Sequence, residues 1–513
     1  MKRENKSTYI ALVALMLLLI FTLFSCTDAD DEDPTVGDTS NDSNISDSGN
    51  GTESGGDNST GGGENNEIKE PETLEEIIAY REEYHAFKFA LLGSELSAEA
   101  IDVLKEIYAL YDEELYIWLA ELYEPAVGGF YYSNSAKEGT SFKPDLESTA
   151  QALELLETSG LASSYRNEWA RMLSEETKSQ ILDFVRNMQS ESDGYFYHPQ
   201  WGRWITSNRR GRDLGWATRI LRALGQKPYY DTPNGVAGLE SERPLTNRLT
   251  TPTVSAVSKV VPTVAREFSS EENFRKYLDG LRINRDSYSA GHTLDSRSGE
   301  INNAGLADYL RDYLREKQCA NGLWEEEISY NAINGLMKIS PRFIVADPFP
   351  NADKALASVM SVINEEIESG LDSHLSQIDT ICYVYNPWVA IRDVIPFLLY
   401  EEQLAFKADL IEKAPDYFKN TLDKLRLFKK EDGGFSYYQT TSAPFSQGAH
   451  VAKLGARESD VNATAIAVST VFKHILPVFG ISSDEAPALY TKYDGVYFLS
   501  VLEREDDEEH FPE

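Results

Sequence analysis

The chain has 513 residues, of which 41% are hydrophobic and 26% are charged, so it can bury a large core. It carries 48 Lys and Arg residues against 84 Asp and Glu residues, a formal net charge of −36. This excess of negative charge repels a phosphate backbone, which argues against nucleic acid as a partner. A chain of this length divides into about three or four ordinary domains unless it repeats one unit.

The N-terminus has the features of a secretory signal. Three basic residues precede an apolar run over residues 9–24, which ends at the tetrad Leu23-Phe24-Ser25-Cys26. A membrane-spanning helix needs roughly 20 apolar residues, so cleavage before Cys26 is favoured over a permanent anchor. The pattern resembles that of bacterial lipoproteins, which implies a signal peptide over residues 1–26 and lipidation of Cys26. An uncleaved signal anchor is the alternative, and either one places the folded part outside the cytoplasm at a bacterial membrane.

Two acidic segments flank the predicted folded domain. Residues 27–68 are rich in Ser, Gly, Asn and Asp, with twelve acidic residues and no basic one. We expect a disordered linker there, because so few apolar residues cannot offset the entropy of ordering. Residues 503–513 form a second acidic tail, which leaves residues 69–502 as the folded domain. This domain holds two cysteines, Cys319 and Cys382, and whether they pair is left open.

A glycine-aromatic motif recurs along the folded domain. Taking one glycine from each copy, the gaps are 65, 128, 111 and 62 residues, so two gaps are about twice the others. This spacing predicts two degenerate copies, near residues 253–260 and 378–385. The five clear copies are Gly128-Gly129-Phe130-Tyr131-Tyr132, Asp193-Gly194-Tyr195-Phe196-Tyr197, Asn321-Gly322-Leu323-Trp324, Asp432-Gly433-Gly434-Phe435 and Asp494-Gly495-Val496-Tyr497-Phe498.

Helical patterns lie on both sides of these motifs. Apolar residues recur at helical spacing before three of them, and alternating β-type runs are nearly absent. Segments of small and apolar residues follow, opened by Asp145, Asp213 and Asp460, which are good N-cap residues. Small residues let such a second helix pack tightly on the inside of a fold. The three helical faces are Leu182, Val185 and Met188; Leu306, Leu310 and Leu314; and Leu422, Leu425 and Leu427.

About six helical hairpins can stack as an open α-solenoid or close into a ring. The repeat resembles the α/α-toroid of terpenoid cyclases, protein prenyltransferases and several polysaccharide lyases and glycoside hydrolases. The resemblance implies an all-α fold, an α/α toroid of about six helical hairpins over residues 69–502. An α-solenoid is the structural alternative.

The motifs of two of these enzyme groups are missing. The only Asp-x-Asp-Asp spacing of the cyclases, Asp28-Ala29-Asp30-Asp31, lies in the predicted linker. Neither Cys319 nor Cys382 has a histidine at the spacing of the prenyltransferase zinc site, and no His-Glu-x-x-His pair occurs. We therefore expect neither cyclase activity nor a metal or other cofactor.

The segment over residues 194–222 stands out by its charge and its aromatic residues. It contains a single acid, Asp213, and places Tyr197, Trp201 and Trp204 among arginines. Aromatic rings stack on sugar rings, and guanidinium groups pair bidentately with carboxylate or sulfate, so the segment favours an acidic polysaccharide as ligand. The arginines are Arg203, Arg209, Arg210, Arg212, Arg219 and Arg222.

Two carbohydrate chemistries fit these residues. A lyase needs a cation or amide to neutralise a uronate and a base near its α-proton. Arg209, Arg212 and Asn208 suit the first role, and Tyr197 or His198 the second. A hydrolase needs two carboxylates. The predicted catalytic residues are Tyr197, His198, Arg212 and Asp213, and the predicted substrate-binding residues are Trp201, Trp204, Asn208, Arg209, Glu147 and Asp460.

The alternative to this site is structural. In it, Trp201, Trp204 and Trp216 fill the core, while Asp213 caps a helix and pairs with an arginine. The leading hypothesis is an extracytoplasmic, lipid-anchored α/α-toroid protein that binds or acts on carbohydrate, as an acidic-polysaccharide lyase or a glycosidase. The second is a non-catalytic surface lipoprotein that captures a glycan or another protein.

Overall fold

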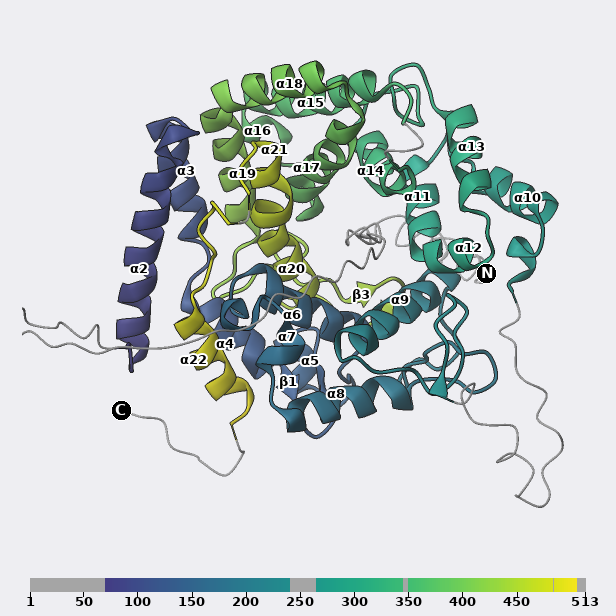
Figure 1. Ribbon diagram of the computed structural model, residues 1–513, viewed down its shortest axis with the longest axis horizontal. Helices are drawn as coiled ribbons and strands as arrows, with labels where there is room; N and C mark the ends of the chain where they lie inside the picture. The colour runs from purple at the N-terminus through teal and green to yellow at the C-terminus, as the bar shows by residue number, and fades with distance from the viewer. Residues whose placement is uncertain (1–69, 240–263, 345–348, 483, 505–513) are drawn as a thin grey trace, which may run out of the picture.

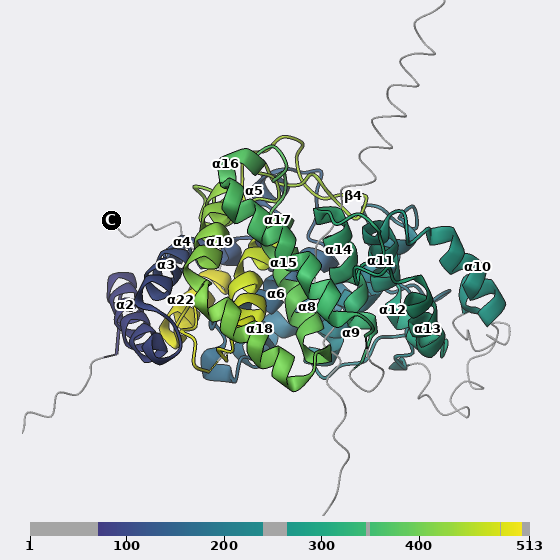
Figure 2. The same cartoon turned by 90° about the horizontal axis from the view of Figure 1, so that it is seen from above.

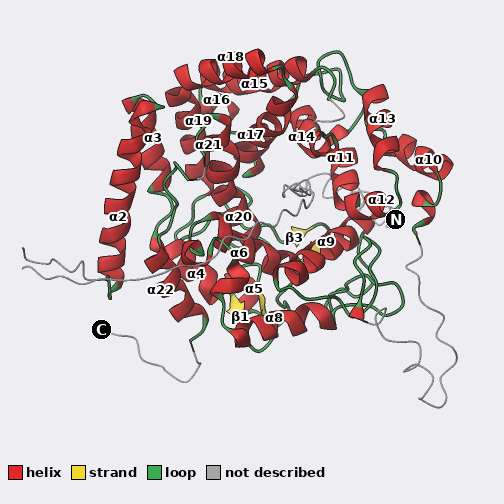
Figure 3. Cartoon of the chain, in the orientation of Figure 1, coloured by secondary structure: helices red, strands yellow, loops and turns green. Residues whose placement is uncertain are grey.

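The computed structural model describes residues 70–239, 264–344, 349–482 and 484–504. The predicted signal peptide with Cys26, the linker over 27–68, the degenerate repeat near 253–260 and most of the acidic tail lie outside these residues. Within them the regular secondary structure is almost entirely helical, and the few strands have two residues each (Figure 3). The predicted all-α class is confirmed.

The helices, in chain order, are α2 (Leu74–Leu91), α3 (Ala98–Tyr108), α4 (Glu113–Glu121), α5 (Asn134–Glu138), α6 (Leu146–Thr158), α7 (Trp169–Met172), α8 (Glu175–Asn187), α9 (Ser207–Ala223), α10 (Glu271–Leu281), α11 (Ser287–Ser296), α12 (Ser298–Asn303), α13 (Ala307–Lys317), α14 (Tyr330–Ile339), α15 (Ala352–Ser369), α16 (Leu371–His374), α17 (Cys382–Val394), α18 (Tyr400–Glu412), α19 (Ala414–Phe428), α20 (Val461–Ser469), α21 (Leu476–Val478) and α22 (Lys492–Leu502). A π-helical segment, η8 (Thr470–Ile475), joins α20 to α21. Two antiparallel hairpins pair β1 (Tyr123–Glu124) with β2 (Gly129–Phe130) and β3 (Phe445–Ser446) with β4 (Ala449–His450).

Six of the described helices pack against one another in a closed cycle. We call α6, α9, α11, α14, α17 and α20 the inner helices. Each inner helix packs against the next in chain order, and α20 packs against α6. Figure 1 shows α8, α10, α13 and α15 on the outside of this cycle, and Figures 1 and 2 place α2 and α10 at opposite edges of the molecule.

Neighbouring inner helices run parallel. Between α6 and α9, Glu147 pairs with Arg212 and Glu154 pairs with Arg219. Moving seven residues toward the C-terminus of α6 therefore corresponds to moving seven residues toward the C-terminus of α9. All N-terminal ends of the inner helices therefore lie at one end of the cycle. The other pairs that run in this direction are Asn208–Thr293 and Gly211–Ser296 (α9 and α11), Ser287–Gly335 and Gly291–Ile339 (α11 and α14), Tyr330–Tyr383 and Asn334–Asn386 (α14 and α17), and Gln151–Asn462 and Glu154–Lys473 (α6 and α20 with η8).

One long apolar helical stretch of the described chain lies within this packing. Residues Val461–Val478 are long and apolar enough to cross a membrane, but 78% of the stretch is buried inside the fold. Because most of this stretch is buried, it forms part of the core; core helices meet the same criteria of length and composition.

Most predicted elements are confirmed. The three predicted helical faces belong to α8, α13 and α19, which lead into glycine-aromatic turns. In these turns Gly194 and Gly433 have φ of 73° and 95°, and a Cβ on either would lie within 2.6 Å of a neighbouring backbone atom. Only glycine fits both constraints.

Two predicted elements are wrong. The motif that begins at Asp494 is not a loop, because it lies in α22, where Asp494 is the third residue and caps Thr491. Asp145 and Asp460 do cap α6 and α20, but Asp213 caps nothing. Helix α9 begins at Ser207, with Thr206 accepting a hydrogen bond from the Arg209 backbone at 3.0 Å, which places Asp213 in the helix interior.

The approach of α9 to α11 generates a stability prediction. A Cβ on Gly211 would lie 2.1 Å from the Ser296 carbonyl oxygen, whereas a Cβ on Gly215, one turn later, would meet nothing within 4 Å. Gly211→Ala should lower the free energy of unfolding by about 1–3 kcal/mol, because the two backbones must separate. Gly215→Ala should raise it by about 1 kcal/mol through helix propensity. Urea denaturation measures both, and equal stability of the two variants would contradict the close approach.

Candidate functional site

A group of buried charges joins the N-terminal ends of α6 and α9. Arg209 is fully buried, with Nη2 2.9 Å from Asp145 Oδ1, Nη1 2.9 Å from Glu147 Oε2 and Nε 2.9 Å from Asp213 Oδ1. Arg212 Nη2 lies 2.9 Å from the other oxygen of Glu147. We call Asp145, Glu147, Arg209, Arg212 and Asp213 the buried ion cluster. One guanidinium thus holds three carboxylates.

The β3–β4 hairpin lies against this cluster, and Figure 1 shows β3 beside α9. Ser446 Oγ donates a hydrogen bond to Glu147 at 2.5 Å, and Arg209 Nη1 donates one to the Ser446 carbonyl at 3.2 Å. Thr206 Oγ1 donates to the Gln447 carbonyl at 3.3 Å. The tip residues Gln447 and Gly448 both have positive φ. The hairpin is therefore tied to the starts of α6 and α9.

The charges of the cluster do not balance. Three carboxylates face two guanidinium groups, so full ionisation leaves one excess negative charge in a buried site. Asp213 is the member with the fewest donors: its oxygens contact Arg209 and receive no backbone hydrogen bond. Burial raises the pKa of Asp213 to about 7; Arg209 opposes the rise, and the neighbouring Glu147 and Asp145 add to it. A proton on Asp213 neutralises the cluster.

Four of the predicted site residues meet in this cluster. They are Glu147, Arg209, Arg212 and Asp213, and Asp145 joins them, which the sequence analysis treated only as a helix cap. Both guanidinium groups are engaged by the chain's own carboxylates. Because the partners lie about one repeat upstream of the arginines, the sequence alone does not reveal the pairing.

His198 is buried with both ring nitrogens engaged. Its Nε2 donates to the Pro144 carbonyl at 2.8 Å, and its Nδ1 accepts from the Gln200 backbone at 3.2 Å. Burial lowers the pKa of His198 to about 4, although Asp145 opposes this shift. A neutral ring with both nitrogens bonded holds the loop to α6, and in this state it has no free nitrogen to take a proton from a substrate.

Tyr197 belongs to a different contact group. Its hydroxyl donates to Asp193 Oδ2 at 2.9 Å, and the Arg203 guanidinium lies over its ring at 4.7 Å. Burial and the Asp193 carboxylate raise the pKa of Tyr197. Arg203 also pairs with Asp193 at 2.6 Å. The contacts of Tyr197 thus do not bring it to the buried ion cluster.

The three tryptophans have different environments. Trp204 is 97% exposed, so the alternative in which it fills the core is wrong. Trp216 is buried, as that alternative expected. Trp201 is half-buried; its ring lies tilted against His198, with centroids 4.2 Å apart, and the Arg209 guanidinium lies over it at 4.8 Å. Trp204 is therefore the tryptophan of this loop whose ring is open to a ligand.

The remaining two predicted binding residues have structural partners. Asn208 donates to Thr293 Oγ1 at 3.2 Å and so links α9 to α11. Asp460 is buried and accepts from the backbone of Tyr437 at 2.8 Å and of Ala463 at 2.8 Å. Burial raises the pKa of Asp460 to about 7, and the backbone donors oppose the rise. Both residues position helices of the cycle.

Further aromatic residues lie near the predicted Trp201 and Trp204, and the sequence did not reveal these three: Phe142, Phe445 and His450. Phe142 meets His450 edge-on at 5.0 Å, Phe445 stacks on His450 at 4.9 Å, and the Trp201 indole donates to the His450 carbonyl at 3.2 Å. We call Phe142, Trp201, Trp204, Phe445 and His450 the rim aromatics. They come from three loops far apart in the sequence, so no local motif marks them.

Buried amide pairs between inner helices were also missed. Gln151 donates to Asn462 at 2.8 Å between α6 and α20, and Asn386 donates to Asn334 at 2.8 Å between α17 and α14. Gln151 lies six residues after the N-cap of its helix, and Asn334 and Asn386 lie five residues after theirs. An alignment of the inner helices by their N-caps would therefore show an amide residue at position five or six in three of them.

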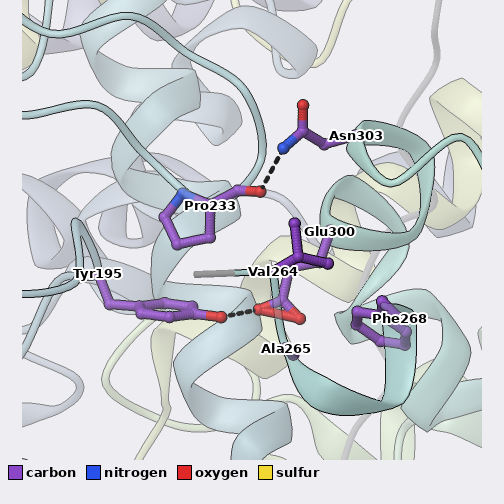
Figure 4. Close-up of a pocket in the computed structure, with 7 residues that line it drawn as sticks. All are labelled: Tyr195, Pro233, Val264, Ala265, Phe268, Glu300 and Asn303. Carbon is purple, nitrogen blue, oxygen red and sulfur yellow. Dashed lines mark hydrogen bonds between the residues drawn. The ribbon is translucent and has the colours of Figure 1, made fainter. Parts of the chain in front are cut away.

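Other candidate sites are small or lack ligands. A pocket between Tyr195 and Glu300, which hydrogen-bond to each other, encloses about 20 Å³, space for little more than one water molecule (Figure 4). In the described part of the chain, no group of three or more His, Cys, Asp and Glu side chains is arranged to hold a metal ion. Cys319 has a free thiol, so it does not pair with Cys382.

Comparison with known proteins finds no matching family model, no matching curated protein and no matching solved structure.

The raised pKa of Asp213 generates a prediction about pH. Between the ordinary Asp pKa of about 3.9 and the folded value of about 7, the folded protein holds a proton that the unfolded chain releases. The free energy of unfolding should therefore fall as pH rises from about 4 to about 7, by up to about 1.4 kcal/mol per pH unit. Asp213→Asn should remove this component of the slope.

Urea denaturation at a series of pH values measures the difference between the wild type and Asp213→Asn. The contribution of Asp460 to the pH dependence is the same in both proteins, so it cancels in the comparison. Glu168→Gln serves as the control, because the exposed Glu168–Arg171 pair contributes little. Parallel profiles for the wild type and Asp213→Asn would show that Asp213 is ionised throughout this range.

Proposed function

We propose that the six helical hairpins form an α/α toroid whose N-terminal end binds carbohydrate. The support for the toroid is the closed cycle of inner helices together with their parallel direction. An open solenoid would leave its first and last inner helices apart, whereas α6 and α20 share the Gln151–Asn462 hydrogen bond.

The observation that carries the carbohydrate proposal is the position of the rim aromatics. They lie in the segments that precede α6, α9 and α20, at the N-terminal end of the cycle. The Trp204 ring is 97% exposed, and exposed indole rings are favoured platforms for apolar ring faces. The buried amides add hydrogen-bonding groups at the same end of the helices.

Location supports the same proposal. The signal-like N-terminus and Cys26 favour a lipid-anchored protein outside the cytoplasm, tethered by the acidic linker. Such a protein meets cell-wall and environmental polymers. We propose capture of a glycan as the function, with the toroid presented at the membrane surface.

Glycoside hydrolysis is the second candidate function. Burial raises the pKa of Asp213 to about 7, as a general acid requires, but its side chain is fully buried against Arg209, so hydrolysis has less support than capture. The lyase alternative has less support, because Arg209 and Arg212 are engaged by Glu147, Asp145 and Asp213 and are not free to neutralise a uronate.

The proposal predicts that Trp204 contributes to glycan binding. Trp204→Ala should weaken the binding of an oligosaccharide by about tenfold, as expected for a contact of about 1.4 kcal/mol. Because the side chain is exposed, the melting temperature should not change. Tyr400→Ala is the matched control, since Tyr400 is an exposed aromatic residue at the start of α18.

Calorimetric titration with a panel of neutral, uronate and sulfated oligosaccharides measures these affinities. Failure of every glycan in the panel to bind the wild-type protein would overturn the proposed function. Equal affinities of Trp204→Ala and the wild type for the oligosaccharide would show that Trp204 does not contribute to the site.

A further inference from the structure

Three buried amide atoms at the N-terminal end of the inner helices have no hydrogen-bond partner among the described residues. They are Gln151 Oε1, Asn386 Oδ1 and Gln447 Nε2, on side chains that are 2%, 0% and 5% exposed. Leaving a buried polar atom unpaired costs about 1–3 kcal/mol. Three such atoms at one end of the fold therefore need a physical explanation.

These amides belong to different elements, and each lies near the start of an inner helix. Gln151 and Asn386 are six and five residues past their N-caps, which is about 9 and about 7.5 Å along the respective helices. Gln447 reaches the neighbouring helix α11 from the tip of the β3–β4 hairpin, where it interacts with His292, which is six residues past its own N-cap. Because the inner helices run parallel, all three amides lie toward the N-terminal end of the cycle.

The charged groups near this level are already neutralised. Arg209 and Arg212 pair with the carboxylates of the buried ion cluster, and Lys338 on α14 pairs with Asp295 at 3.2 Å. Burial, Lys338 and Arg212 lower the pKa of His292 to about 3, so its ring is neutral at physiological pH. An anionic ligand gains no free cation from these groups.

The unpaired atoms determine which ligand chemistry fits. Gln151 Oε1 and Asn386 Oδ1 are acceptors, so the ligand must donate hydrogen bonds to them. A carboxylate or sulfate only accepts and would face these carbonyl oxygens with its own negative charge. Gln447 Nε2 needs an acceptor as well. A sugar hydroxyl both donates and accepts, and it serves all three atoms.

We infer that the N-terminal end of the inner helices, beneath the β3–β4 tip, holds a subsite for a neutral, hydroxyl-rich sugar that Gln151, Asn386 and Gln447 recognise by hydrogen bonds. This inference rests on the proposed glycan binding and names its ligand class. A sugar can enter this subsite only if the hairpin tip moves. The tip is held by hydrogen bonds from Ser446 to Glu147, from Arg209 to the Ser446 carbonyl and from Thr206 to the Gln447 carbonyl.

The test compares neutral with anionic probes on the full-length protein. Cellohexaose, xylohexaose and mannohexaose are the neutral probes, and hexagalacturonate and chondroitin sulfate hexasaccharide are the anionic ones. At least one neutral probe should bind with an affinity that changes less than about twofold between about 50 and 500 mM NaCl, because no ion pair is screened. The anionic probes should not compete.

Variants separate recognition from folding. Asn386→Leu removes the unpaired acceptor and should weaken neutral-sugar binding by about tenfold. It also removes the donor to Asn334 Oδ1, so it should lower the free energy of unfolding by about 1–3 kcal/mol. Gln447→Leu on the hairpin is an independent second variant, should the first fail to fold. Asn420→Leu, on the outer helix α19, is the matched control and should bind as the wild type does.

Three outcomes would overturn the inference. Lys143 and Lys453 are exposed lysines next to the rim aromatics. If only anionic probes bind, if their affinity falls with salt, and if a Lys143→Ala/Lys453→Ala double variant abolishes it, the glycan-binding proposal stands. The neutral subsite is then wrong. If neutral probes bind equally to folded Asn386→Leu and Gln447→Leu, the site lies elsewhere. If no probe binds, the proposed function fails with the subsite.

Discussion

The buried guanidinium of Arg209 is the interaction on which this end of the molecule depends. It joins the cap of α6 through Asp145, the first turn of α6 through Glu147, its own helix α9 through Asp213 and the β3–β4 hairpin through Ser446. Removing one partner of such a buried pair leaves an uncompensated charge and costs about 3–5 kcal/mol. The positions of two inner helices and of the hairpin are thus coupled through one side chain.

This coupling decides what remains available for a ligand. Because the carboxylates of α6 and α9 occupy Arg209 and Arg212, the cations are not available to a ligand, whereas amide atoms are among the buried groups without partners and the open surface is aromatic. Neutral hydrogen-bonding groups below a ring of aromatic side chains suit a sugar, whose hydroxyls and apolar faces need both. Most of the arginines that give residues 194–222 their positive charge form ion pairs with carboxylates of the chain itself.

Local features of the fold were predictable from the sequence, and long-range partners were not. Helical spacing identified α8, α13 and α19, and Asp145 and Asp460 were recognised as caps because a cap depends on the next three residues. Asp213 was misread because Thr206 offers the same capping chemistry earlier. The arginines were read as ligand-binding because their partners Asp145 and Glu147 lie 64 and 62 residues upstream of Arg209.

The most direct measurement is the structure of the protein in complex with a neutral hexasaccharide that binds it. The account predicts one sugar ring at the N-terminal end of the inner helices, with hydroxyls within hydrogen-bonding distance of Gln151, Asn386 and Gln447 and with Trp204 against an outer ring. The Arg209 contacts to Asp145, Glu147 and Asp213 should be unchanged. A sugar bound on the outer helices, or one whose carboxylates displace the partners of Arg209 and Arg212, would contradict it.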